Sequence, residues 1–518
     1  MPDLALFDDG PPPPCPAPFN MAAHTFAAAA RAPDKVALEV LAAPGVVTER
    51  WTHGALAEAV RRTAAGLAAL GLRPGDRLLM RLGNSSDFPV LFFAANALGA
   101  VPVPTSAQLT RVEIAAIIAD LAPSLIACGP GLELPDAPGA AVIGPAEIAA
   151  LRNAEPRPFA ATAPDDPAYI VYTSGASGRP KGVVHAQRAA WARRMMWDGW
   201  YGLTEHDRVL HAGAFNWTYT LGAGLTDPWA IGATALIYLG PPDRTVWPRL
   251  AAAHDATIFA AAPGIYRQML DAGADVSTGF AALRHGLSAG EALPEPLGRA
   301  WSDATGKPIF EAIGMSEVST YVSFSPSRPP APGFTGYPQP GRRVAILPET
   351  GVTPVARGED GLLAVSRRDP GLMLGYWRQP GTTAASLRGE WFLTGDRARM
   401  AEDGAVAFLG RVDDLINAGG HRVSPQEVEA ALLRHPGVAD AAAVERAVRP
   451  GVGIVAAFYV PRGAPPPEAE LAAHCAGLLA RYKCPRAFHP VASLPRAANG
   501  KLLRRSLREA PPPEQSGA

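Results

Sequence analysis

Charged residues are scarce in this chain, and neither sign dominates. Asp, Glu, Lys and Arg make up only 18% of the 518 residues, and the formal net charge at pH 7 is −1. Proteins that bind nucleic acids or anionic membrane surfaces usually carry a basic excess that attracts phosphate groups. The composition therefore gives no electrostatic case for either kind of partner.

Cysteines are equally few. The chain has four, Cys15, Cys128, Cys475 and Cys484, without the CxxC or Cys/His spacing of a structural zinc site. The N-terminus also lacks a basic segment followed by an apolar core, so we expect no signal peptide. We expect a reduced, cytoplasmic protein without a metal cluster, and the sequence leaves open whether it forms a homodimer.

Long apolar runs are absent as well. The stretch from Ala212 to Pro242 holds a single charged residue, Asp227, but polar residues, proline and several glycines interrupt it. A helix needs about 20 consecutive apolar residues to cross a membrane. The sequence therefore predicts no membrane span.

Strand-like and helix-like runs alternate through most of the chain. They do so from Asp34 to Gly129 and again over about 170–340. Such alternation is typical of doubly wound α/β layers with mostly parallel sheets. We expect two such layers, joined by an irregular segment from Leu132 to Pro167 that is rich in Pro, Ala and Gly.

Shorter elements follow the second layer. The runs at Gly361 to Ser366, Trp391 to Arg397 and Ala405 to Leu409 predict antiparallel strands of a short β-barrel-like part. These strands complete a large N-terminal domain, for which we expect the bounds 1–411.

The last unit is a small α+β domain, expected over 412–518. Its first helix should begin at Ser424, because Ser424, Pro425 and Glu427 are typical of an N-cap, a first-turn proline and a capping-box glutamate. The proline-rich first 20 residues should form an extended arm, because proline cannot donate a backbone hydrogen bond.

The segment from Tyr169 to His185 is the first with chemical character. In it, a strand-like run opens into a loop of hydroxyl groups and glycines with one lysine, Lys181. Hydroxyl groups, exposed backbone N–H groups and a positive charge can together bind phosphate. The cofactor-binding candidates here are Thr173, Ser174, Gly175, Ser177, Gly178 and Lys181. The spacing differs from that of a P-loop, and a plain surface turn is the alternative interpretation.

Five further motifs follow in order. They are Ser288-Ala289-Gly290-Glu291-Ala292-Leu293-Pro294, Glu311-Ala312-Ile313-Gly314-Met315-Ser316-Glu317, Trp391-Phe392-Leu393-Thr394-Gly395-Asp396, the run from Gly410 to Val423, and Pro495-Arg496-Ala497-Ala498-Asn499-Gly500-Lys501. Taken singly, they could be a solvated turn, a helix cap or a polar loop. Together with the first loop, they resemble the motifs of the adenylate-forming enzymes, the family of acyl-CoA synthetases, luciferases and peptide-synthetase adenylation domains. The resemblance covers about residues 20 to 508.

The resemblance implies a binding site for ATP. The adenine-side positions would be Gly290, Glu291, Ala292 and Ile313, where Ile313 replaces an aromatic residue that is common in the family. Ser316 would contact the α-phosphate.

Further polar residues would complete that site. Glu317 would hold Mg²⁺, which prefers hard oxygen ligands. Asp396 and Arg411 would bind the ribose, because a carboxylate can accept two hydroxyl protons. Arg422 would lie near the phosphates.

The resemblance also implies that the small domain is mobile. Asp413 would be its hinge, Gly420 would lie where a pantetheine arm passes, and Lys501 would reach into the active site during adenylation. ATP, Mg²⁺ and coenzyme A would then be the cofactor and co-substrates. The expected catalytic residues are Lys501, Glu317 and Ser316.

The acid that is activated should bind beside the low-charge stretch after Ala212. We expect Phe215, Trp217, Tyr219 and Gly314 to line its pocket, which resembles that of benzoate-type CoA ligases. Neutral Asn216 argues against an amino acid, whose ammonium group would need an acidic partner.

Small aryl acids rank first as substrates. The alternatives are a medium-chain or alicyclic acyl-CoA synthetase, a ligase that loads an acyl carrier protein, and a nucleotide- or acyl-binding protein that has lost catalysis. The last would be expected to lack Lys501, Glu317 or Asp396, and all three residues are present.

Overall fold

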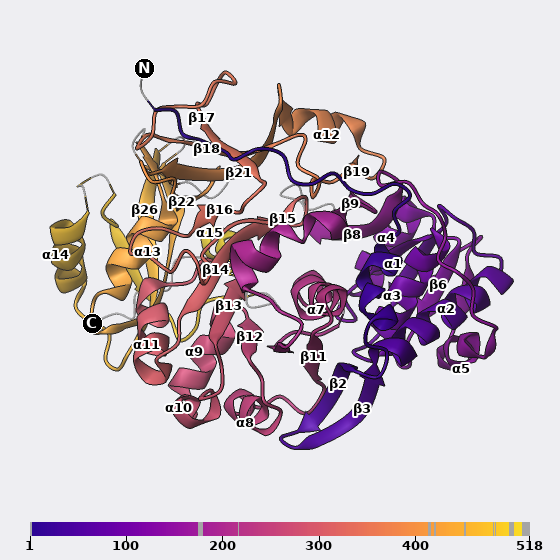
Figure 1. Ribbon diagram of the computed structural model, residues 1–518. Helices are drawn as coiled ribbons and strands as arrows, with labels where there is room; N and C mark the ends of the chain where they lie inside the picture. The colour runs from indigo at the N-terminus through magenta and orange to yellow at the C-terminus, as the bar shows by residue number, and fades with distance from the viewer. Residues whose placement is uncertain are drawn as a thin grey trace.

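The computed structural model describes residues 3–174, 180–215, 217–412, 416–418, 421–449, 452–479, 481, 483–496 and 502–509. Figure 1 shows a large body that contains most of the chain, with the C-terminal part against one side of it. The chain is mixed α/β, as the sequence predicts.

The first layer is a four-stranded parallel sheet with the order β5-β4-β6-β7. Its strands are β4 (Arg77–Arg81), β5 (Val101–Pro104), β6 (Leu125–Cys128) and β7 (Ala141–Ile143). The helices of this part are α1 (Met21–Thr25), α2 (His53–Ala69), α3 (Asp87–Leu98), α4 (Arg111–Leu121) and α5 (Pro145–Ala150). Thr52 is the N-cap of α2, because its hydroxyl oxygen accepts the N–H of Ala55 at 3.1 Å.

The second layer is a nine-stranded sheet with the order β16-β15-β14-β13-β12-β10-β11-β2-β3. The strands from β14 to β2 along this order are parallel, and β3, β15 and β16 are antiparallel additions at its two ends. The strands are β2 (Val36–Ala43), β3 (Val46–Thr52), β10 (Arg208–His211), β11 (Thr234–Tyr238), β12 (Ile258–Ala261), β13 (His285–Ala289), β14 (Ile309–Met315), β15 (Ser319–Ser323) and β16 (Tyr337–Pro338). The helices around it are α6 (Ala189–Ala192), α7 (Asp227–Ile231), α8 (Val246–Ala253), α9 (Pro263–Asp271), α10 (Val276–Gly279) and α11 (Glu295–Thr305).

Two details of the expected layers are wrong. The strands β2 and β3 lie within the stretch assigned to the first layer, yet β2 pairs with β11 of the second sheet, with Val40 opposite Ile237. The segment 132–167 is also less irregular than expected, because it contains β7 and α5. Sheet membership depends on long-range pairing, which the local pattern does not encode.

The nine-stranded sheet has a switch in strand order at β10. The next strand in sequence, β11, lies on one side of β10, and β12 lies on the other. In open α/β sheets, ligands bind in the crevice outside the carboxyl ends of the strands at such a point. The low-charge stretch follows β10, and two of the motifs lie at the carboxyl ends of β13 and β14, so the topology brings these three segments to one edge.

An antiparallel six-stranded sheet completes the large body. Its order is β1-β17-β18-β21-β20, and β22 also pairs with β21, so the pairings among the described strands leave the sheet open. Its elements are β1 (Leu6–Asp8), β17 (Arg343–Leu347), β18 (Asp360–Ser366), β20 (Leu387–Arg388), β21 (Trp391–Met400) and β22 (Val406–Arg411). A separate three-stranded sheet consists of β8 (Pro167–Ser174), β9 (Pro180–Ala186) and β19 (Gly375–Tyr376), which is followed by α12 (Pro380–Ala385).

The C-terminal unit is α+β, as expected. It contains β23 (Ile416–Ala418), β24 (His421–Val423), α13 (Pro425–Leu433), β25 (Val438–Arg449), β26 (Val452–Pro461), α14 (Glu468–Leu478), β27 (Ala487–Pro490) and α15 (Arg504–Glu509). The expected start of α13 is confirmed, but the capping box is not formed. Lys483 Nζ instead lies 2.8 Å from a carboxylate oxygen of Glu427.

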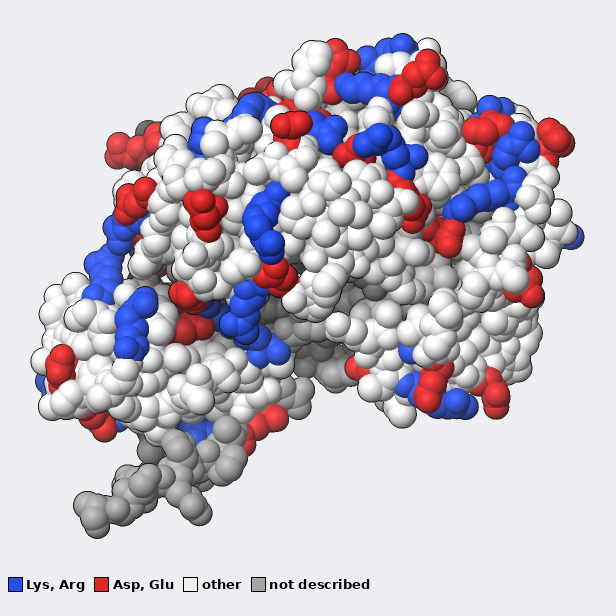
Figure 2. All heavy atoms as spheres, turned by 90° about the horizontal axis from the view of Figure 1, so that it is seen from below, with Lys and Arg blue, Asp and Glu red and all other residues white. Residues whose placement is uncertain are grey.

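The charged side chains of one face of the molecule are shown in Figure 2. On the face in Figure 2, Lys and Arg side chains are interspersed with Asp and Glu, without a large patch of one sign. In the part of the chain that the structure describes, no helix is long and apolar enough to cross a membrane. Cys15, Cys128 and Cys475 are free thiols.

Candidate active site

Strands β8 and β9, which flank the candidate phosphate loop in the sequence, pair as an antiparallel hairpin. Thr173 lies opposite Lys181, and Ser174 opposite Pro180 is the last pair of the ladder. The side chains of Thr173 and Lys181 are half-buried. Gly175, Ser177 and Gly178 lie outside the described residues, as does the side chain of Ser174.

Tyr376 connects this hairpin to the predicted metal ligand. Its strand β19 pairs with β9, and Lys181 Nζ lies 5.2 Å from the centre of the Tyr376 ring. The Tyr376 hydroxyl donates a hydrogen bond of 2.8 Å to Oε1 of Glu317. Burial and the Glu317 carboxylate both raise the pKa of Tyr376, so the phenol keeps its proton and remains a donor.

Glu317 and Ser316 lie in the turn between β14 and β15. The Glu317 side chain is buried, and its backbone carbonyl accepts the N–H of Met373 at 2.8 Å. His185 Nε2 donates a hydrogen bond of 2.6 Å to the carbonyl of Ser316. The turn is therefore fixed on both sides by segments distant in sequence.

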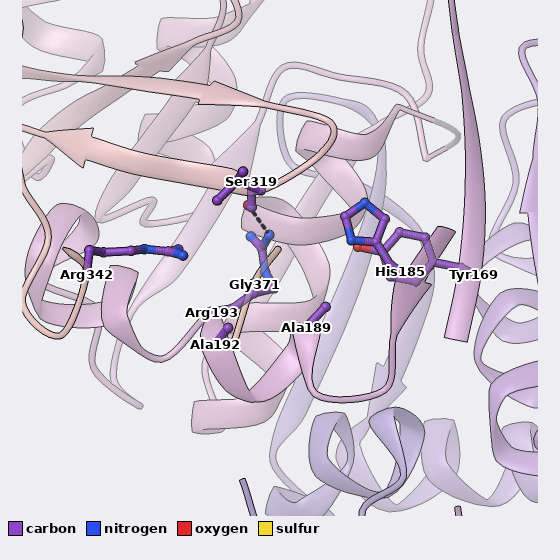
Figure 3. A pocket seen from close by; sticks show the side chains of 9 residues that line it. Tyr169, His185, Ala189, Ala192, Arg193, Ser319, Arg342 and Gly371 are labelled. Atoms are coloured by element: carbon purple, nitrogen blue, oxygen red, sulfur yellow. Dashed lines mark hydrogen bonds between the residues drawn. The ribbon is translucent and has the colours of Figure 1, made fainter. Parts of the chain in front are cut away.

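A small cavity of about 10 Å³ lies beside this turn. Figure 3 shows His185 stacked on Tyr169 there, and Arg193, which donates to Ser319 Oγ at 2.9 Å. Burial lowers the pKa of His185 to about 4, so its ring is neutral at physiological pH and holds the Nε2 proton that it donates to Ser316. The cavity has room for about one water molecule.

The ribose candidates Asp396 and Arg411 form a pair. They lie opposite each other on β21 and β22, and Arg411 Nη1 donates to Asp396 Oδ1 at 3.1 Å. Burial raises the pKa of Asp396, while Arg411 acts in the opposite direction. The hydroxyl of Tyr321 on β15 donates to Asp396 Oδ2 at 3.3 Å, so the pair is joined to the hairpin that carries Glu317.

The adenine-side turn follows β13. Gly290 has a φ of +95°, a left-handed conformation that favours glycine. The turn is held from β14, where Glu311 Oε1 accepts the N–H of Leu293 at 2.7 Å. Ile313 is half-buried on the same strand, one residue beyond Ala312, the partner of Ala289 on β13. Gly290, Glu291, Ala292 and Ile313 thus come from adjacent strand ends.

The structure also gives a role to the buried carboxyl group of Glu311, which holds the adenine-side turn and to which the motif alone assigned none. Burial raises its pKa to about 8, so the group is largely protonated at neutral pH. It binds its proton more tightly in the folded state than in the unfolded chain. The stability it contributes is therefore complete below about pH 4.5 and is lost as the pH rises through about 8.

We expect Glu311→Gln to remove this pH dependence, because glutamine keeps an acceptor for the Leu293 N–H and cannot ionise. The melting temperature of the variant relative to the wild type should rise between pH 5 and pH 8.5. Glu295→Gln, at an exposed carboxylate on α11, is the control and should show no such trend. A constant difference between Glu311→Gln and wild type at every pH would contradict the prediction.

The predicted acid-pocket residues divide into two groups. Phe215 is fully buried in the apolar core that contains Leu221, Leu225 and Trp229. Trp217 and Tyr219, by contrast, pack edge to face, with ring centres 5.2 Å apart.

His211, at the end of β10, lies against both rings of the second group. Its ring centre is 4.5 Å from that of Tyr219 and 6.0 Å from that of Trp217. The segment directly after Tyr219, Thr220–Thr226, is a π-helix, a geometry that is frequent at functional sites. Trp217 also borders the adenine-side turn, because a Cβ added at Gly290 would lie 3.8 Å from its ring. Of these two rings, Trp217 borders the adenine-side turn, and Tyr219 also stacks on the buried ring of Trp200.

Gly314, which we expected to line the acid pocket, is also required by the packing of two strands. It lies at a β-bulge between β14 and β15. A Cβ at this position would come within 2.8 Å of the backbone of Ser319 and Thr320. The close approach of the two strands therefore favours glycine here, whatever acid binds.

Several predicted residues lie outside the described residues. In the small domain these are Asp413, Gly420, Lys501 and the side chain of Arg422, and in the large domain Asn216. The residues on either side of 497–501 do reach the site. Leu502 N–H donates to Glu291 Oε1 at 3.1 Å, and Arg496 Nη1 lies 3.4 Å from Glu291 Oε2.

Sequence patterns missed Tyr376, Tyr321, His185 and the role of Glu311. Each contacts a motif residue from a segment 18 to 131 positions away. His185 and Glu311 stand within the quoted motifs, which was the one available signal. Tyr321 and Tyr376 lie outside them.

Comparison with known proteins covers both parts of the chain. The family model described as AMP-binding enzyme matches residues 25–377, and the model described as AMP-binding enzyme C-terminal domain matches 427–501. A 3-hydroxybenzoate–CoA ligase from Aromatoleum sp. is 32% identical, covering 88% of this chain and 91% of that protein. A benzoate–CoA ligase from Thauera aromatica is 33% identical, covering 89% and 91%. The crystal structure of ATP-bound MatB from Rhodopseudomonas palustris is 28% identical, covers 95% of this chain and 98% of its own, and has a TM-score of 0.86.

Proposed function

Since this chain belongs to the family of AMP-binding enzymes, we propose that it is an AMP-forming acid–CoA ligase that activates a small aryl acid. In the first half-reaction, a carboxylate oxygen attacks the α-phosphorus of ATP, and pyrophosphate leaves. In the second, the thiol of coenzyme A attacks the acyl carbon, the thiol loses its proton, and AMP leaves. The products are acyl-CoA, AMP and pyrophosphate.

One observation carries the proposal. The phosphate hairpin, the Glu317 turn and the ribose pair form one connected site, in which Tyr376 links Lys181 to Glu317 and Tyr321 joins Asp396 to the strand after Glu317. A cation, a buried carboxylate and a ribose acceptor are the groups that ATP requires. Their convergence beside the carboxyl end of β14 in the nine-stranded sheet supports a nucleotide site.

The residues present fit Mg²⁺ as a nucleotide-bound ion. Among the described residues, no group of three or more His, Cys, Asp or Glu side chains could hold a metal. Mg²⁺ in nucleotide sites usually takes one or two carboxylates, and phosphates and waters supply its other ligands. Glu317 would hold it, since its buried carboxylate is fixed by Tyr376. When bound, the ion would offset the negative charge of the phosphate oxygens.

The chain's own residues have separate tasks in adenylation. Lys181 and the hairpin would neutralise and orient the outer phosphates, and Asp396 with Arg411 would hold the ribose. Lys501 would stabilise the charge that develops as the carboxylate attacks.

The second half-reaction requires Lys501 to leave. We place the domain boundary between 411 and 412 and the hinge at Asp413. Rotation there would bring Gly420 to the path of the thiol. Arg422 would remain close to the phosphates.

Two observations support an aryl acid. Trp217 offers a flat apolar surface beside the adenine-side turn, and Tyr219 packs edge to face against it. The relatives named above are ligases of benzoate and 3-hydroxybenzoate.

The chain has only four cysteines, spaced far apart in the sequence. This usage is typical of proteins from a reducing compartment, so we place the enzyme in the cytoplasm.

A pyrophosphate-release screen over aryl, alicyclic and C2–C10 acids, with and without coenzyme A, tests the proposal. We expect aryl acids to give the highest kcat/KM and acetate to give the lowest. A preference for medium-chain or alicyclic acids would overturn the aryl assignment alone. Acylation of a carrier protein in preference to coenzyme A would replace the thiol acceptor.

A further inference from the structure

Four charged side chains form a continuous chain between the small domain and the large body. Arg267 on α9 places Nη1 3.0 Å from Oδ2 of Asp440 on β25. Arg496 places Nη2 2.9 Å from the same oxygen and Nη1 3.4 Å from Oε2 of Glu291. Arg267, Asp440, Arg496 and Glu291 thus alternate in sign, and we call them the interdomain ion-pair chain.

This chain differs from ordinary surface ion pairs in its burial. The four side chains are 24%, 17%, 26% and 19% exposed, in the order given. Partly buried charges are screened less by salt than exposed ones. Asp440 is the central member, because one carboxylate oxygen serves an arginine from each domain.

The chain ends at the adenine-side turn. Glu291 receives Arg496 on one carboxylate oxygen and the backbone N–H of Leu502 on the other, at 3.1 Å. Arg496 and Leu502 flank residues 497–501, the segment that includes Lys501. Both flanking residues are therefore bound to the side chain of Glu291, beside the candidate nucleotide site. Asp440 holds the other guanidinium nitrogen of Arg496.

Arg267 provides the second anchor on the large body. Its helix α9 follows β12, next to β13, from which the Glu291 turn extends. The small domain is thus held at two points of one sheet edge, at Arg267 through Asp440 and at Glu291 through Arg496. Two separated contacts fix an orientation, whereas one would allow rotation about it.

We propose that Arg267 and Asp440 are positioning residues for the adenylation half-reaction. They hold the small domain so that Arg496 and Leu502 bring the segment of Lys501 to the nucleotide. This inference rests on the proposed function. The pairs Arg267–Asp440 and Arg496–Glu291 join the two domains, so both must break when the small domain rotates for the thiol step. Their removal therefore slows adenylation without slowing the thiol step.

The test measures the two half-reactions separately in Arg267→Met and Asp440→Asn. Arg267→Met keeps an apolar side chain and removes the charge, and Asp440→Asn keeps the shape. We expect acyl-adenylate formation to fall roughly 2- to 5-fold in Arg267→Met, as expected for the loss of one such pair, and further in Asp440→Asn. Conversion of added acyl-adenylate to acyl-CoA should stay unchanged or rise.

Glu429→Gln is the matched control. Glu429 is also a partly buried carboxylate paired with an arginine, Arg504, at 2.8 Å, and both residues belong to the small domain. Its replacement should leave the ratio of the two half-reaction rates at the wild-type value. The control thus separates a positioning effect from a general loss of stability in the small domain.

Each outcome decides the matter. A wild-type ratio in both Arg267→Met and Asp440→Asn, or an equal loss of both half-reactions, contradicts the positioning role. If the wild type itself forms acyl-adenylate from no acid, the proposed function fails instead. The wild-type rate of adenylation therefore distinguishes the two failures.

Discussion

Replacement of Lys501 by alanine is expected to abolish acyl-adenylate formation while leaving the thiol step intact. The lysine charge would be needed as the carboxylate attacks the α-phosphate, and loss of such a group costs on the order of 10²- to 10³-fold in rate. Pyrophosphate release from ATP and the acid measures the first step. Consumption of synthetic acyl-adenylate with coenzyme A measures the second.

Lys181→Ala is the control for Lys501→Ala. Lys181 belongs to the phosphate hairpin and packs on Tyr376, so its loss should act mainly through the KM for ATP. The described residues on either side of the 497–501 segment, Arg496 and Leu502, both reach Glu291. Equal loss of both half-reactions in Lys501→Ala would contradict the role proposed for this lysine.

Replacement of Glu317 by glutamine is expected to lower the rate of adenylation by on the order of 10²-fold or more. The amide keeps the size of the side chain and an acceptor for the Tyr376 hydroxyl, but it lacks the negative charge that Mg²⁺ requires. The measurement is the adenylation rate as a function of free Mg²⁺. The variant should need far more Mg²⁺ for half-maximal rate.

Tyr376→Phe separates the charge of Glu317 from its orientation. This variant removes the 2.8 Å hydrogen bond to Glu317 and leaves the carboxylate in place. A partner that only orients a metal ligand typically contributes 10- to 100-fold, so we expect a smaller loss than in Glu317→Gln. A wild-type dependence of the adenylation rate on Mg²⁺ in Glu317→Gln would contradict the assignment of Glu317 as a ligand of Mg²⁺.

Local sequence patterns predicted the elements of the fold better than their partners. The strand from Val36 to Ala43 illustrates the limit. It lies in the part of the chain assigned to the first layer, but it pairs with β11 in the second sheet. Glu427 illustrates it at a smaller scale, because Lys483, 56 positions away, takes the carboxylate that the pattern assigned to a capping box.

The candidate site shows the same division. The order of the motifs predicted Glu317, Asp396 and Arg411 as site residues, and the structure places Asp396 and Arg411 in direct contact. The tyrosines that hold Glu317 and Asp396 lie outside every motif, and no local signal marks them. Gly314 shows a further limit, since the same glycine satisfies both a deep pocket and a close strand approach.

The most direct test of the account is a single-turnover reaction of excess enzyme with ATP and an aryl acid, in which one sample is quenched before coenzyme A is added and a second sample is quenched after its addition. We predict one equivalent each of pyrophosphate and enzyme-bound acyl-adenylate, and conversion of that adenylate to acyl-CoA and AMP when coenzyme A follows. Formation of ADP and phosphate instead, or no product from any acid in the screen, would contradict the central claim that this chain is an AMP-forming acid–CoA ligase.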